Sequence, residues 1–163
     1  MNTVTHALLP VLAAGVYNRS QRLVEERRGV FSPKQLIAIG LFGAAPDLLN
    51  PHLSLDDRYS SWSHGVLFWA FLTIGLIAFR LARSRPRAMY MALWLSGAYL
   101  FHMFCDAISG GVAWLYPLGG DIVGAYYIEP IWWIPLDVIC CLFAYGLFRA
   151  IPGIRRSRII KSG

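Results

Sequence analysis

The sequence has 163 residues, of which 56% are hydrophobic and 14% aromatic, and its mean hydropathy is +0.49. A chain this apolar is not an ordinary soluble domain, so the composition predicts an integral membrane protein in contact with lipids. The formal net charge is +6, but the basic residues fall in short segments between apolar runs, a pattern that sets membrane orientation. We therefore expect no nucleic-acid partner.

The first two predicted helices cover residues 4–17 and 33–49. The first is short for a membrane span. The second begins at Ser32-Pro33, a capping residue followed by proline at the first helical position. Its small residues, among them Gly40 and Gly43, form a face that favours close helix packing in lipid.

The remaining predicted helices cover residues 62–82, 88–108 and 131–150. The run 88–108 has the length and composition of a membrane-spanning helix. Ser61 and Ser63 are expected to cap the helix that begins near residue 62. Together these patterns predict an all-α fold, an integral membrane helical bundle of about five helices, in which residues 1–163 form a single membrane-embedded domain.

The loops between these helices differ in charge. Residues 19–34, 80–87 and 149–161 are basic, whereas residues 50–61 and 111–130 are nearly neutral or acidic. Because basic loops stay in the cytoplasm, five spans with the amino terminus outside place all three basic segments inside.

Ionisable side chains lie at the helix ends that this orientation places outside. On a helix, His102 and Asp106 are i, i+4 neighbours that share one face, about 6 Å apart along the axis. A neighbouring helix can satisfy each such residue, but ionisable groups in an apolar span are by default functional candidates. The residues that converge on this end of the bundle are His6, Asp47, His64, His102 and Asp106.

Three imidazoles and two carboxylates are a usual ligand set for zinc or a similar ion, and such sites are commonly built between the helices of a bundle. We expect one or two ions, zinc or another divalent metal. Two ions need a bridging carboxylate, which Asp47 or Asp106 can supply.

Four further residues are candidates with competing interpretations. Arg58 can supply a fixed positive charge for a phosphate, or it is a solvated loop arginine. Glu129 can act as a ligand or general base, or it is an interfacial carboxylate. His52 follows a proline in a loop and is a possible additional ligand. Asp137 can accept the free ring N–H of a ligating histidine.

An ordered set of motifs resembles the YdjM-like family of membrane-bound proteins, which are described as metal-dependent hydrolases of bacterial inner membranes. The motifs are Thr5-His6, residues 45–49 (APDLL), residues 61–64 (SWSH), residues 102–106 (HMFCD), residues 110–112 (GGV) and residues 114–117 (WLYP). The family is in turn distantly similar to zinc-dependent phospholipase C and to the single-strand-specific zinc nucleases.

That resemblance implies a zinc phospholipase C-like core with His6, Asp47, His64, His102 and Asp106 as metal ligands. The larger enzymes add His and Glu ligands downstream, and this sequence has no histidine after His102. The resemblance therefore does not extend to a full three-metal site.

The leading hypothesis is a hydrolase of the bacterial inner membrane in which a metal-activated water attacks a phosphate ester or phosphodiester of an amphiphilic, lipid-like substrate. The site then faces the non-cytoplasmic side. The alternative is a non-enzymatic metal-ion carrier or sensor that uses the same ligands. A carrier needs polar residues along the whole membrane depth, and the first three predicted helices lack them in their inner halves. A haem protein is a third reading, against which the pairing of His102 with Asp106 argues.

Overall fold

The computed structural model describes residues 3–24, 30–51, 54, 56–82 and 86–150, and it is helical. The five α-helices are α1 (Thr3–Val24), α2 (Pro33–Leu49), α3 (Val66–Ala82), α4 (Pro86–Ala107) and α5 (Trp133–Tyr145). Short helical turns are η1 (Asp56–Ser60), η2 (Trp62–His64), η3 (Pro130–Trp132) and η4 (Gly146–Ala150). The described residues contain no strand beyond two isolated bridges, which confirms the predicted all-α class.

Some helix boundaries differ from those predicted. Helix α1 continues past residue 17 to Val24, because Arg19, Gln21 and Arg22 are good helix formers and no glycine or proline interrupts the segment. The segment Trp62–His64 is a separate 3-10 turn, which Gly65 separates from α3. Helix α4 begins at Pro86, where proline is tolerated at the start of a helix.

Only one helical segment of the described chain, Pro130–Ala150, is both long and apolar enough to cross a membrane by itself. Helix α3 is apolar but has 17 residues. Helix α4 has 22 residues, and its apolar sequence is interrupted near its end by His102 and Asp106. The outer surface is nevertheless apolar, since α3 has no buried residue and α5 has only Cys140.

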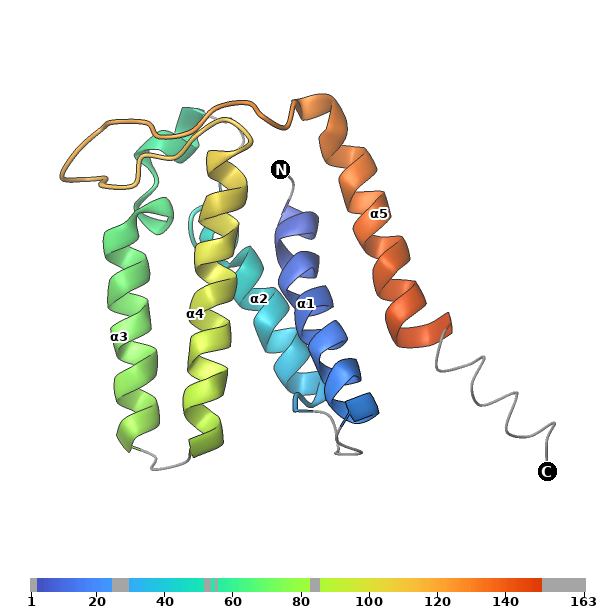
Figure 1. The fold of residues 1–163 in the computed structure, drawn as a ribbon. Coiled ribbons are helices and arrows are strands. Elements are labelled where there is room, and N and C mark those ends of the chain that lie inside the picture. Colours follow the sequence, from blue (N-terminus) through green and yellow to red (C-terminus); the bar gives the residue numbers. More distant parts are fainter. Residues whose placement is uncertain (1–2, 25–29, 52–53, 55, 83–85, 151–163) are drawn as a thin grey trace, which may run out of the picture.

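Helices α1, α2 and α4 pack together, while α3 packs on α4 and α5 packs on α1 (Figure 1). The core of this bundle is formed by Ala14, Phe31, Ile39, Met91, Leu95 and Ala98. The small residues of α2 permit its close approach to α1, because a Cβ atom at Gly43 would lie 2.5 Å from the carbonyl oxygen of His6. The predicted small-residue face is therefore a helix contact.

The amino ends of α1, α3 and α5 lie at the same end of the bundle as the carboxyl ends of α2 and α4 (Figure 1). We call this the site end. The turns η1 and η2 and the connection from α4 to α5 also lie there. Arg19, Lys34 and Arg80 belong to the opposite halves of α1, α2 and α3, so these three basic residues lie away from the site end along the bundle.

Candidate metal centre

The last two turns of α4 provide an imidazole and a carboxylate at one point. His102 Nε2 lies 3.2 Å from Asp106 Oδ2, and both side chains are buried. The i, i+4 spacing on a helix produces this arrangement, as the sequence predicts.

Two other elements bring the second imidazole and the second carboxylate to the same point. Asp47, near the end of α2, places Oδ1 3.4 Å from His102 Nε2 and 3.4 Å from His64 Nε2. His64, the last residue of η2, also lies 3.3 Å from Asp106 Oδ2. The four donor atoms lie within 4.8 Å of one another, so Asp47, His64, His102 and Asp106 can hold a metal ion.

These separations fit tetrahedral coordination. Zinc bonds to nitrogen and oxygen are about 2.0 to 2.2 Å long, so the edges of the coordination tetrahedron are about 3.3 to 3.6 Å. Four of the six separations between these donors are 3.2 to 3.4 Å, and all six are within 4.8 Å. The donor set fits, because two carboxylates buried this close together repel each other unless a cation lies between them.

Hydrogen bonds to the outer ring nitrogens orient both imidazoles. His102 Nδ1 lies 2.7 Å from the carbonyl oxygen of Gly43, and because a carbonyl only accepts, the ring nitrogen donates. His64 Nδ1 lies 2.9 Å from Ser61 Oγ. In both rings the other nitrogen, Nε2, therefore faces the centre. Hydrogen bonds of this kind, outside the coordination sphere, fix the tautomer and the orientation of a ligating histidine.

Ser61 and Ser63 do not cap a helix, contrary to the prediction, since η2 has no side-chain cap hydrogen bond. They hold the turn that carries His64. Ser61 Oγ accepts from the side-chain amide of Asn50, and Ser63 Oγ donates to the carbonyl oxygen of Pro46, one residue before Asp47. Sequence analysis missed this role because it depends on where a 3-10 turn folds against α2.

Arg58 lies beside the centre and is 2% exposed, so it is not a solvated loop arginine. Its Nη1 is 2.8 Å from Asp106 Oδ1, the carboxylate oxygen that does not face His64 and His102. Gly110 makes room for this guanidinium, because a Cβ atom there would lie 2.8 Å from Arg58 Nη2. Gly110 also has φ +132°, a conformation that glycine alone adopts readily.

His6 lies at the edge of the four-donor group. Its Nδ1 is 2.9 Å from His102 Nδ1 and 3.3 Å from His102 Nε2, and its Nε2 is 3.7 Å from Asp106 Oδ1. The side chain is 0% exposed, and Nε2 makes no hydrogen bond within the described part of the chain. His6 is thus a fifth metal-capable group, in contact with His102 and Asp106.

The other predicted site residues have different positions. Asp137 accepts a 3.0 Å hydrogen bond from the Thr5 amide and a shorter one from the Thr5 hydroxyl, so it contacts the residue before His6. Glu129 is exposed at the start of η3, makes no capping hydrogen bond and is not among the four donors. His52 lies outside the described residues.

No curated protein and no solved structure matches the chain. A family described as YdjM inner membrane protein matches residues 1–159, which is nearly the whole sequence. The chain therefore belongs to the YdjM family of inner membrane proteins.

Proposed function

We propose that this YdjM family member is a membrane-bound, metal-dependent hydrolase of the phosphate ester or phosphodiester of an amphiphilic, lipid-like substrate. The observation that carries the proposal is the convergence of Asp47, His64, His102 and Asp106 from three separate elements, with donor separations of 3.2 to 3.4 Å. Zinc is the ion that this mixture of imidazole and carboxylate donors suits best.

The charges of the centre suit an anionic substrate. Asp47 and Asp106 contribute two negative charges, and Arg58 offsets one of them. A divalent ion would make the net charge of this group positive, which attracts a phosphate. A bound ion that took a water as a fifth ligand would lower the pKa of that water to about 7 and polarise a phosphoryl oxygen.

His6 supports a reaction rather than storage of the ion. The four-donor set does not include it, yet its buried ring contacts that of His102. Buried polar atoms are nearly always hydrogen-bonded, so a ring nitrogen without a hydrogen bond at a candidate centre needs a partner. His6 Nε2 can accept a hydrogen bond from a water or bind a second ion there.

The place of the centre in the bundle supports an amphiphilic substrate. It lies at the site end, while Arg19, Lys34 and Arg80 lie in the opposite halves of their helices. By the positive-inside rule, this arrangement favours a centre toward the non-cytoplasmic face, near the level of lipid head groups. Asp47 is the most exposed of the four donors, with 17% of its side chain accessible, and it marks the side from which a substrate enters.

A metal-ion carrier or sensor is the second candidate. Four protein donors complete a tetrahedral shell, which is typical of sites that hold an ion permanently. A carrier, however, needs polar groups across the membrane, and the main core cluster between α1, α2 and α4 is apolar. Of the two non-enzymatic alternatives, a sensor therefore fits the structure better than a carrier.

Metal content and hydrolysis, measured on the same preparations, separate these candidates. We expect the purified protein to retain zinc and to hydrolyse bis(p-nitrophenyl) phosphate. The variant His102→Ala should lose both. The variant Asp121→Asn, which removes an exposed loop carboxylate, serves as a control and should lose neither. Equal metal content in His102→Ala and the wild type contradicts the metal centre. A wild-type protein that holds zinc but hydrolyses no phosphodiester favours the sensor.

A further inference from the structure

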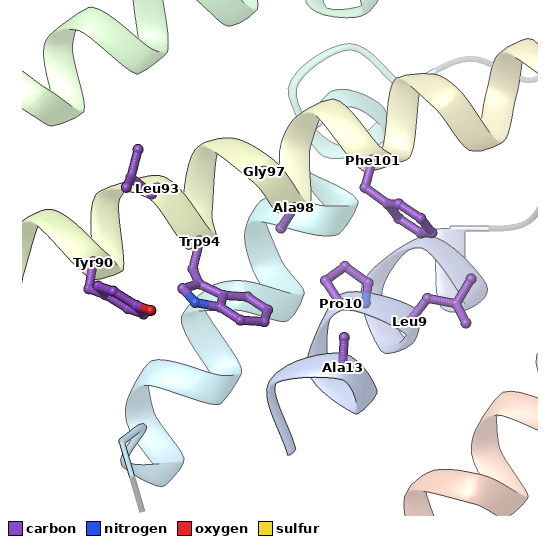
Figure 2. Close-up of a pocket in the computed structure, with 9 residues that line it drawn as sticks. All are labelled: Leu9, Pro10, Ala13, Tyr90, Leu93, Trp94, Gly97, Ala98 and Phe101. Atoms are coloured by element: carbon purple, nitrogen blue, oxygen red, sulfur yellow. The ribbon is translucent and has the colours of Figure 1, made fainter. Parts of the chain in front are cut away.

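An apolar groove of about 670 Å³ runs along the interface of α1 and α4 (Figure 2). Its volume falls in the range of ligand sites. No lining residue is charged, and the only ones with a polar side-chain atom are Tyr90 and Trp94. The groove exists because α1 and α4 both pack on α2 but have few contacts with each other along this stretch.

Small residues make the groove deep. Gly97 and Ala98 of α4 lie between the larger side chains of Trp94 and Phe101, and they face Pro10 and Ala13 of α1 (Figure 2). A Cβ atom at Gly97 would meet nothing within 4 Å. The groove is therefore open space that a side chain at position 97 can fill.

One end of the groove adjoins the metal centre. Phe101 immediately precedes His102, and Pro10 lies one helical turn after His6. The rings of His6 and His102 meet edge to face at this end, with centroids 4.0 Å apart. From there α1 leans away from α4 with distance from the site end (Figure 1).

The length of the groove matches one leaflet of a bilayer. Its lining on α4 extends from Tyr90 to Phe101, a rise of about 16 Å along the helix axis. The hydrocarbon core of a bilayer is about 30 Å thick, so one leaflet contributes about 15 Å. A hydrocarbon chain that enters from the leaflet next to the site end therefore fits the groove from end to end.

We propose that this groove holds the hydrocarbon chain of a membrane amphiphile whose phosphate head lies at the metal centre. The phosphate head group in this inference rests on the proposed function. The hydrocarbon chain rests on the apolar groove itself. An uncharged, apolar groove on an inner membrane protein suits a hydrocarbon chain, and it offers polar head groups too few partners. Phe101 and Pro10 line the groove, and they lie next to His102 and one helical turn from His6 along their helices, so a chain bound in the groove ends close to the metal centre.

Photolabelling tests the groove independently of catalysis. The probe is hexadecyl phosphate with a diazirine in the middle of its chain, added to the protein in phosphatidylcholine nanodiscs. In the wild type we expect labels on residues 9–13 and 90–101. Gly97→Phe fills the groove and should remove them. Gly75→Phe is the matched control, because it also adds a ring to a helical glycine with nothing within 4 Å, but on α3. Equal labelling of residues 9–13 and 90–101 in both variants overturns the proposal.

Chain-length dependence of hydrolysis tests the connection to the metal centre. We expect Gly97→Phe to raise the KM for hexadecyl p-nitrophenyl phosphate several-fold and to leave the KM for methyl p-nitrophenyl phosphate unchanged. Gly75→Phe should change neither KM. If the wild type hydrolyses neither ester but carries the expected labels, the hydrolase proposal fails and the chain site stands. If both esters are hydrolysed and Gly97→Phe has no effect on either KM, the chain site fails and the hydrolase stands.

Discussion

The guanidinium of Arg58 lies 2.8 Å from Asp106 Oδ1, and both side chains are 2% exposed. The other oxygen of this carboxylate, Oδ2, faces His64 and His102. Arg58 thus fixes which oxygen of Asp106 is directed to the metal centre. It contacts the metal centre through Asp106.

Removal of this guanidinium should weaken both the fold and the metal centre. Loss of one partner of a buried ion pair costs about 3 to 5 kcal/mol, because the other charge stays buried. We expect Arg58→Met to lower the melting temperature in detergent and to reduce zinc affinity. Lys34→Met, at an exposed position on α2, removes the same charge and should change neither. Unchanged zinc affinity in a folded Arg58→Met protein would show that Asp106 is held in place by other contacts.

The hydrogen bond between Ser61 and His64 should matter for metal affinity. Ser61 Oγ lies 2.9 Å from His64 Nδ1, and loss of such a contact outside the coordination sphere typically lowers metal affinity about 10- to 100-fold. We expect Ser61→Ala to show this loss in a competition titration with a zinc chelator. Ser60→Ala is the matched control, because the adjacent Ser60 is exposed and hydrogen-bonds within its own turn to the carbonyl oxygen of Asp57. Equal affinities of the two variants would contradict the orienting role.

The position of His102 and Asp106 on one helix face was predictable, because a four-residue spacing fixes it in any α-helix. The grouping of Asp47 and His64 with them followed from the order of the helices, which brings the end of α2 and the start of the α3 region to the same end of the bundle. The partners of these residues were not predictable. The Gly43 carbonyl, Ser61 and Arg58 reach the centre only because a helix crossing and two 3-10 turns place them there.

The membrane-spanning segments were less well predicted. Composition identified the fifth apolar run, residues 131–150, which the structure extends by one residue to Pro130–Ala150. The run 88–108 is helical as expected, since α4 covers Pro86–Ala107, and His102 and Asp106 lower the hydropathy of its last two turns.

Thr5 and Asp137 connect α5 to the helix that carries His6, and this contact should support stability. The Thr5 amide belongs to the first turn of α1, where backbone N–H groups lack helical partners, and Asp137 supplies an acceptor. We expect Asp137→Ala to leave buried donors unsatisfied, to cost about 1 to 3 kcal/mol and to weaken zinc binding. Thr73→Val breaks a comparable contact between α3 and α4, with Ser96, and should lower the melting temperature without affecting zinc. If both variants bind zinc equally, the contact between Thr5 and Asp137 has no role in positioning His6.

The last prediction concerns the contact between Gly43 and His6. The two residues lie where α2 crosses α1, and a Cβ atom at position 43 would lie 2.5 Å from the His6 carbonyl oxygen. Gly43→Ala must therefore separate the helices and displace the carbonyl that accepts from His102. Elsewhere in a helix the same substitution stabilises by about 1 kcal/mol, so Gly75→Ala, with nothing within 4 Å, should raise the melting temperature. We expect Gly43→Ala to lower it and to release zinc, as elemental analysis of the purified variants would show. A Gly43→Ala protein as stable and as rich in zinc as Gly75→Ala would mean that α1 and α2 do not need this close approach to assemble the centre.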